Sequence, residues 1–337
     1  MSDWQFWIDR GGTFTDVIGL DPSGATHTLK LLSERPEHYA DAAIEGIRRI
    51  LDTAPAAQRR IAAVRMGTTV ATNALLERTG EPTVLLMTQG LADVIRIGTQ
   101  QRPDIFALDI ELPTMLYAEV IEARERLDAH GTIIRPLDES RLREELEAAS
   151  RKGYSSIAIV LMHAWQNPEH ELRAAAIAAD AGFEQISVSH EVSPTMRIVP
   201  RGDTTLIDAY LTPVLGRYVA GVTSGLAEVA TNTPLEFMQS HGGLTTASQF
   251  RGCNSVLSGP AGGVVGIAKV AEAAGFEQIV GFDMGGTSTD VALYAGDFER
   301  ASETTVSGVR ITTPMLHIHT IAAGGGSIIR YVDGRLQ

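Results

Sequence analysis

The sequence of 337 residues has little cysteine, no excess of positive charge and no long apolar run. Its single cysteine, Cys253, excludes an internal disulfide and is typical of a reducing compartment. Lysine and arginine number 28 against 41 acidic residues, so the formal net charge of -13 argues against broad nucleic-acid binding, which needs basic patches. No uninterrupted apolar run reaches the roughly 18 residues of a membrane span, and no signal-peptide pattern opens the sequence. We therefore expect a cytoplasmic protein with neither a nucleic-acid nor a membrane partner.

The sequence does contain a string of nine residues that occurs twice. Residues 9–17 read DRGGTFTDV and residues 283–291 read DMGGTSTDV, so seven of the nine positions are identical. Each copy lies between two apolar segments, a context typical of a strand, a tight glycine turn and a second strand. Two such hairpins predict two related lobes that face one nucleotide.

The segments between the two hairpins alternate between short apolar strands and amphipathic helices. This alternation predicts an α/β layer architecture. A helix is expected over residues 205–229, kinked or split by Pro213, because proline lacks the N–H group that a helix interior uses. Buried strands and further helices are expected at residues 83–88, 156–162, 39–51, 139–150 and 168–181.

Three regions follow from this pattern. Residues 1–204 form the first lobe, with a less regular insertion near residues 98–138, and residues 205–276 supply connecting helices and a strand. Residues 277–337 begin a second lobe. Only 46 residues follow the second copy of the string, too few for the helices of a second α/β layer. We therefore expect the second lobe to be incomplete, its remainder lying beyond this chain.

The chemistry of the repeated string suits a bound triphosphate. Glycine lets the backbone approach a polyanion, and threonine hydroxyls donate to phosphate oxygens. The predicted phosphate contacts are Gly11, Gly12, Thr13, Thr15, Gly285, Gly286, Thr287 and Thr289. The alternative, that the string is only a favourable hairpin turn, is weakened by its duplication with both aspartates kept.

The aspartates of the two copies are the candidate catalytic residues. Asp9 and Asp283 each end a strand, where a carboxylate can hold Mg²⁺, a cation that prefers one or two carboxylates together with phosphate oxygens. Asp16 and Asp290 face away from the threonines in a regular strand. They are either structural or, if a bulge turns them, catalytic bases.

Two other glycine-rich loops and several histidines are weaker candidates. Gly324, Gly325 and Gly326 either approach the nucleotide or form a turn, and we favour the first because three glycines cost folding entropy. Residues 258–263 precede a helix and either bind an anion or pack the lobes together. A metal site at His317 and His319 is disfavoured because no third ligand is visible. His190 and His241 end predicted strands, where active-site residues of open α/β sheets often lie, so both are weak candidates. The P-loop and Rossmann signatures of other nucleotide-binding proteins are absent from the sequence.

These strings together resemble the hydantoinase/oxoprolinase family of the actin/Hsp70/sugar-kinase ATPase superfamily, and within it the ATP-dependent 5-oxoprolinases. The likeness runs along essentially the whole chain and is carried by residues 8–17, 29–34, 45–51, 66–78, 189–194, 258–263, 283–290 and 322–327.

The resemblance implies an actin-like, ribonuclease H-like α/β architecture with one full lobe and a truncated second lobe. It implies the cofactors ATP and Mg²⁺ and the ATP-dependent hydrolysis of 5-oxo-L-proline to L-glutamate. It also implies a hydantoinase B-like subunit or region as a partner. A hydantoinase or acetone carboxylase-type subunit, a small-molecule kinase of the same superfamily and an inactive fragment remain alternatives.

Overall fold

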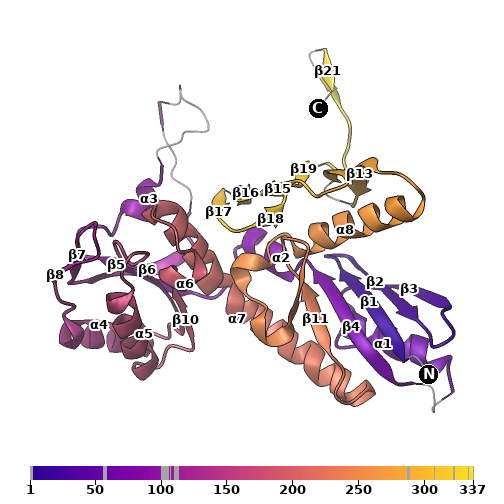
Figure 1. Cartoon of the computed structure of the whole chain (residues 1–337), viewed down its shortest axis with the longest axis horizontal. Coiled ribbons are helices and arrows are strands. Elements are labelled where there is room, and N and C mark those ends of the chain that lie inside the picture. Colours follow the sequence, from indigo (N-terminus) through magenta and orange to yellow (C-terminus); the bar gives the residue numbers. More distant parts are fainter. Residues whose placement is uncertain are drawn as a thin grey trace.

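The computed structural model describes residues 3–55, 59–99, 106, 108–109, 114–286, 289–306, 308–321, 323–332 and 334–336. Figure 1 shows two groups of strands and helices joined by the long helix α7 (Ile198–Val229). A third group of strands lies above helix α8 (Ser258–Ala273).

A six-stranded sheet carries the first copy of the repeated string. Its strand order is β12-β11-β4-β1-β2-β3, in which β1, β2 and β3 are antiparallel neighbours while β4 and β11 run parallel to β1. The strands are β1 (Trp4–Arg10), β2 (Phe14–Leu20), β3 (Thr26–Leu32), β4 (Ile61–Thr68), β11 (Leu235–Met238) and β12 (Leu244–Thr246).

Helices α1 (Ala42–Asp52) and α7 bury apolar side chains against this sheet, and α2 (Val70–Leu76) follows β4. Asp41 caps α1 by accepting hydrogen bonds from two backbone N–H groups of its first turn, at 2.9 and 3.1 Å. A methyl group at Gly46 would lie 2.5 Å from Val17, so glycine is needed for the helix to reach the sheet.

A four-stranded parallel sheet is inserted between β4 and β11, with the order β10-β9-β5-β6. Every residue of β5 and β9 is buried, because helices cover both faces. Val84 and Leu86 pack with α4 and α5, whereas Leu85 and Met87 pack with α3 and α7. The elements are β5 (Thr83–Thr88), α3 (Val94–Ile97), β6 (Tyr117–Ala123), β7 (Arg126–Leu127), β8 (Ile133–Arg135), α4 (Glu139–Arg151), β9 (Ser156–Val160), α5 (Glu169–Asp180), β10 (Gln185–Val188) and α6 (Ser189–Val192).

Helix α7 passes through Pro213 without a break, so the split expected from the sequence does not occur. Proline cannot donate to the carbonyl four residues earlier, which belongs to Ala209. The hydroxyl of Ser156 on β9 donates to that carbonyl instead, at 2.7 Å. A side chain from the inserted sheet thus satisfies the group that the proline leaves without a helical donor.

The second copy of the string forms an antiparallel hairpin of β13 (Gln278–Met284) and β14 (Thr289–Ala295), to which β19 (His319–Ile321) adds a third strand. The two hairpins expected from the sequence are therefore confirmed. Two 3₁₀ turns, Ala247–Gln249 and Gly252–Asn254, precede α8. The remaining strands form the ladders β15 (Arg300–Ala301) with β18 (Met315–Leu316), β16 (Thr304–Val306) with β17 (Val309–Ile311), and β20 (Tyr331–Val332) with β21 (Arg335–Leu336).

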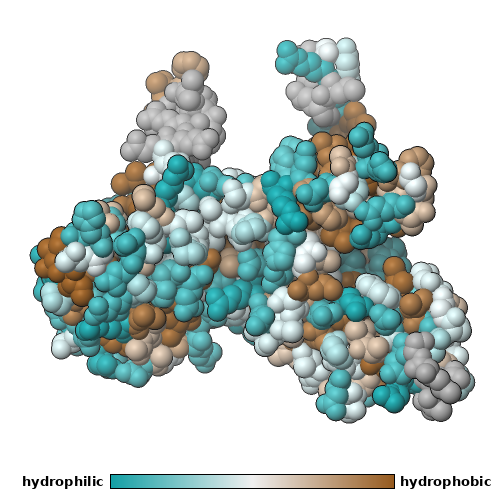
Figure 2. Space-filling view, viewed as in Figure 1, coloured by the Kyte–Doolittle hydropathy of each residue, from teal (hydrophilic) through white to brown (hydrophobic). Residues whose placement is uncertain are grey.

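The surface is mainly hydrophilic around the inserted sheet, and brown apolar atoms are mixed with teal ones over the third group of strands (Figure 2). There Val280, Phe282 and Met284, alternate residues of β13, are each more than half exposed. No helix in the described part of the chain is long and apolar enough to cross a membrane.

Candidate active site

The two hairpins have the same internal register, so equivalent residues of the repeated string occupy equivalent places. Asp9 pairs with Asp16 across the first hairpin, and Asp283 pairs with Asp290 across the second. Neither hairpin has a bulge in this region. Each pair of aspartates therefore lies on one face of its hairpin, because directly opposite residues share a face.

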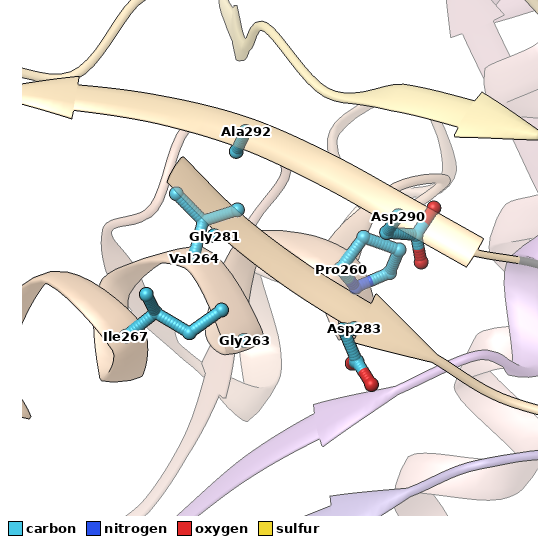
Figure 3. A pocket seen from close by; sticks show the side chains of 8 residues that line it. All are labelled: Pro260, Gly263, Val264, Ile267, Gly281, Asp283, Asp290 and Ala292. Atoms are coloured by element: carbon cyan, nitrogen blue, oxygen red, sulfur yellow. The ribbon is translucent and has the colours of Figure 1, made fainter. Parts of the chain in front are cut away.

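The first aspartates of the two hairpins both lie beside the start of α8, one helical turn apart along the same face. A Cβ atom at Gly259 would be 3.9 Å from Asp9 Oδ1, and one at Gly263, one helical turn further, would be 3.7 Å from Asp283 Oδ2. In Figure 3, Asp283 and Asp290 lie beside Pro260 and Gly263 in a small recess between α8 and the second hairpin.

The electrostatics of Asp9 reflect its burial and the charges of two nearby aspartates. Its side chain is open to solvent on one side, but backbone atoms of β4 and α8 crowd it elsewhere. This loss of hydration, together with the negative charges of Asp16 and Asp283, raises the pKa of Asp9 from 3.8 to about 6. Burial raises the pKa of Asp290 as well, with a further contribution from Asp283.

The second threonine of each hairpin is buried and bonded to a neighbouring segment. Thr15 lies 3.0 Å from the hydroxyl of Ser33, which in turn donates to Gly11 O at 2.7 Å. Thr289 donates to Ala323 O at 2.6 Å. Both threonines are at most 3% exposed, so their hydroxyls hold the hairpins in place from within.

The turn of the first hairpin is the part that faces solvent. Gly12 and Thr13 are exposed, and Gly11 donates to Phe14 O at 3.0 Å to close the turn. In the second hairpin Gly285 and Gly286 are exposed in the same way. Thr287, the counterpart of Thr13, lies outside the described residues.

The second aspartate of each hairpin contacts the strand on its outer side. Asp16 Oδ2 is 2.5 Å from Nζ of Lys30 on β3, and Asp290 Oδ1 accepts from Thr320 on β19 at 2.6 Å. In both cases the partner is the residue directly opposite in the sheet. The duplication in the sequence therefore extends to the contacts of the hairpins.

The loop that contains Gly324, Gly325 and Gly326 packs onto the turn of the second hairpin. Gly325 N donates to Gly285 O at 2.9 Å, and Gly326 N donates to Gly286 O at 2.8 Å. A Cβ atom at Gly324 would be 2.6 Å from Gly285 O, so a side chain there is incompatible with this contact. The three glycines lie beside the predicted phosphate turn, and two of their N–H groups hold it.

Residues 258–263 join the two lobes and lie beside both aspartates. Ser258 Oγ donates to Met238 O at 2.7 Å, and a Cβ atom at Gly259 would lie 2.9 Å from Thr69 Cγ2. Sequence reasoning did not select Asn73, whose amide is 3.3 Å from the Cβ position of Gly12. In the sequence, Asn73 is distinguished only by its place in residues 66–78, one of the stretches that carry the family resemblance.

The histidines lie outside this arrangement. The rings of His317 and His319 are 4.5 Å apart, and no group of three potential metal ligands occurs among the described residues. His190 Nδ1 is 2.7 Å from buried Glu171, whose charge and hydrogen bond raise the histidine pKa. His241 contacts Gln239.

Comparison with known proteins places this geometry in a family. The family model described as the hydantoinase/oxoprolinase N-terminal region matches residues 5–182, and the model described as hydantoinase/oxoprolinase matches residues 201–337. The chain belongs to the hydantoinase/oxoprolinase family. It is 44% identical to 5-oxoprolinase 1 of Arabidopsis thaliana, over 99% of this chain and 29% of that protein. It is 33% identical to caprolactamase subunit alpha of Pseudomonas jessenii, over 99% of this chain and 50% of that subunit.

Solved structures of the family show the same fold. The ATP-dependent caprolactamase of Pseudomonas jessenii superimposes with a TM-score of 0.85 at 32% identity, over 98% of this chain and 49% of that one. Nucleotide-free acetone carboxylase gives a TM-score of 0.82 at 24% identity, over 99% of this chain and 50% of that one. These likenesses confirm the actin-like α/β architecture. The chain spans about half the length of these two proteins and less than a third of the 5-oxoprolinase.

Proposed function

We propose that this chain is the part of an ATP-dependent 5-oxoprolinase that binds ATP and Mg²⁺. The observation that supports the proposal most directly is that Asp9 and Asp283, far apart in the sequence, lie one turn apart beside the start of α8. The similarity to a 5-oxoprolinase and to an ATP-dependent caprolactamase supports the use of ATP on a cyclic amide.

Asp9 and Asp283, beside the start of α8, fit a divalent cation. The charge of Asp283 raises the pKa of Asp9, so the two carboxylates repel in the absence of a counter-charge, and a bound cation removes that repulsion. We propose that Asp9 and Asp283 hold Mg²⁺, which neutralises charge on the phosphates when it is bound. Asp16 and Asp290 then orient the hairpins through Lys30 and Thr320.

The exposed turns of the two hairpins are the proposed phosphate contacts. Gly11, Gly12 and Thr13 form one turn, and Gly285 and Gly286 belong to the other. Glycine-rich backbone can approach phosphate oxygens and donate N–H groups to them. Thr287 is proposed by analogy with Thr13, whereas Thr15, Thr289 and the glycines at 324–326 contribute by holding the turns.

The reaction explains why a lactam hydrolase would use ATP. Resonance stabilises the amide of 5-oxo-L-proline, so water attacks its carbonyl carbon slowly. Transfer of the γ-phosphoryl group to the amide oxygen releases ADP and makes the carbonyl carbon more open to attack by water. Addition of water and cleavage of the carbon–nitrogen bond, with a proton passing to the nitrogen, leave the new carboxyl group as an acyl phosphate. A second water hydrolyses the acyl phosphate, so the products are L-glutamate, ADP and phosphate. Catalysis of phosphoryl transfer depends mainly on positioning and charge stabilisation.

We propose that the complete activity also needs a hydantoinase B-like subunit or region, since the caprolactamase relative is by name one subunit of an assembly. We further propose a cytoplasmic location. The regions 1–204, 205–276 and 277–337 remain our proposal for the organisation of the chain.

The proposed function is tested in two stages. Isothermal titration of the chain with MgATP should show binding that Asp9→Asn weakens and Asp180→Asn, on an exposed residue of α5, leaves unchanged. Glutamate formation from 5-oxo-L-proline and MgATP should then appear when a hydantoinase B-like region and the remainder of the second lobe are supplied. Equal rates with caprolactam would point to a broader lactam hydrolase. No MgATP binding at millimolar concentration, or no glutamate in any combination, would refute the proposal.

A further inference from the structure

Asn73 lies beside the exposed turn of the first hairpin and is separate from the groups that hold the hairpins together. A Cβ atom at Gly12 would be 3.3 Å from Asn73 Nδ2. The residue is partly exposed, and its side chain makes no hydrogen bond with any other described residue. Its carboxamide therefore keeps N–H donors and a carbonyl acceptor available where the predicted phosphate turn faces solvent.

The helix that carries Asn73, α2, is tied to the end of β1. The N–H and the hydroxyl of Thr69, one helical turn before Asn73, both donate to Arg10 O, at 3.1 and 3.2 Å. Thr72 donates to Val256 O, in the segment before α8. Residues four apart share one face of a helix, so the contacts of Thr69 fix the face from which Asn73 projects. A group that is fixed in this way loses little entropy when it binds a ligand.

Asn73 also makes the surroundings of the two hairpins chemically different. The repeated string gives both hairpins the same glycines, threonines and aspartates. Asn73 lies outside the repeat, and the strand before its helix runs beside β1, with Gly67 opposite Asp9. The turn of the second hairpin contacts the backbone of residues 324–326 instead. A molecule that meets the phosphates from the side of the first hairpin would therefore find a neutral amide next to Gly12.

We propose that Asn73 binds the amide of the lactam substrate and selects rings in which the carbonyl and a free N–H lie side by side. A five-membered lactam holds these two groups in the cis arrangement, so one carboxamide can donate to the first and accept from the second. Nδ2 donates to the lactam oxygen, whose second lone pair remains for the γ-phosphoryl group, and Oδ1 accepts from the lactam N–H. The phosphates of ATP are acceptors and would leave Oδ1 without a donor, so this residue type suits an amide better. The inference rests on the proposed function, because it takes the lactam as the acceptor of the phosphoryl group at this site.

The test compares 5-oxo-L-proline with the corresponding lactone acid, 5-oxotetrahydrofuran-2-carboxylate, in which a ring oxygen replaces the N–H group. Each is titrated into the chain in the presence of Mg²⁺ and a non-hydrolysable ATP analogue. The lactam should bind about tenfold more tightly, because the lactone loses one hydrogen bond and sets its ring oxygen against Oδ1.

Variants of Asn73 should change this preference. In Asn73→Ala the lactam should bind about tenfold more weakly than in the wild type, and the ratio of lactam to lactone affinity should fall to about one. Asn73→Gln keeps the carboxamide on a longer side chain and should retain part of the preference. Gln249→Ala removes an exposed carboxamide from the 3₁₀ turn at Ala247–Gln249, and this matched control should bind both ligands like the wild type.

The melting temperature of Asn73→Ala should not fall, because alanine is the better helix former and the side chain has no hydrogen bond to lose among the described residues. Its affinity for MgATP should equal that of the wild type. Weakened MgATP binding with an unchanged preference for the lactam would show that Asn73 contacts phosphate and would overturn the inference.

The outcomes separate this inference from the proposed function. Equal binding of lactam and lactone by the wild type, no binding of the lactam, or a preference that Asn73→Ala leaves unchanged would also overturn the inference. In each of these cases MgATP binding by the unmodified chain would still support the proposed function, whereas its absence would count against that function.

Discussion

Substitution of Gly286 by alanine is a direct test of phosphate binding at the second hairpin. Among the described residues other than its chain neighbours, no heavy atom lies within 4 Å of its Cβ position, and its φ is outside the left-handed region that favours glycine. Alanine therefore fits the free chain. Such a substitution changes the free energy of unfolding by about 0.4–1 kcal/mol in the stabilising direction, because it restricts the unfolded chain.

The affinity for MgATP should change much more than the stability. If a phosphate oxygen approaches the backbone at this turn, the added methyl group occupies its place and removes at least one hydrogen bond to a charged group. Such a bond contributes about 1.5–3 kcal/mol, and about 1.4 kcal/mol corresponds to a tenfold change in affinity. We therefore expect the Kd for MgATP to rise about 10- to 100-fold.

The assay combines isothermal titration with thermal unfolding of the same samples. Gly221→Ala is the matched control, because Gly221 lies on the exposed face of α7 and also has no atom within 4 Å of its Cβ position. This variant should bind MgATP like the wild type. An unchanged Kd in Gly286→Ala, in a variant that melts at or slightly above the wild-type temperature, would show that phosphate does not contact this turn. A large loss of stability would show that the steric argument is wrong.

Three further predictions concern residues of the same site. The raised pKa of Asp9, about 6 instead of 3.8, means that its ionisation costs stability as the pH rises through this interval. Asp9→Asn should therefore melt higher than the wild type near pH 8 but not near pH 4, which thermal unfolding at both pH values can check. Gly324→Ala, whose methyl group would be 2.6 Å from a backbone oxygen, should destabilise the chain by about 1–3 kcal/mol. Gly325→Ala, with its nearest atom at 3.7 Å, should melt like the wild type. Thr15→Val should lower the unfolding free energy by about 1 kcal/mol, whereas Thr13→Ala should weaken MgATP binding alone, as titration and denaturant unfolding would show.

The local elements could be predicted because their signals lie within short stretches of the sequence. Both hairpins follow from glycine turns between apolar segments, and α1 follows from its apolar periodicity. Of the kink or split expected at Pro213, the split does not occur. The hydroxyl that satisfies the Ala209 carbonyl belongs to Ser156, and no local pattern relates these two residues.

The separate roles of the threonines in the repeated string could be assigned only from the three-dimensional structure. Alternate residues of a strand share a face, so the sequence predicted that Thr13 and Thr15 point the same way. In the structure β2 begins only at Phe14, so Thr13 belongs to the exposed turn and Thr15 to the buried part of the strand. Thr15 meets Ser33 at the end of β3, and its counterpart Thr289 meets Ala323 after β19. Those contacts depend on which strands become neighbours, which periodicity does not specify.

The sequence by itself determined the two hairpins, the α/β class and the family, because turn chemistry, periodicity and the order of short strings are properties of neighbouring residues. Only the tertiary structure decided that β11 pairs with β4 across an inserted sheet, and that Asp9 and Asp283 meet beside the first turn of α8. The physical reason is that burial of apolar faces selects the packing of whole elements, and that packing determines which distant charges face one another.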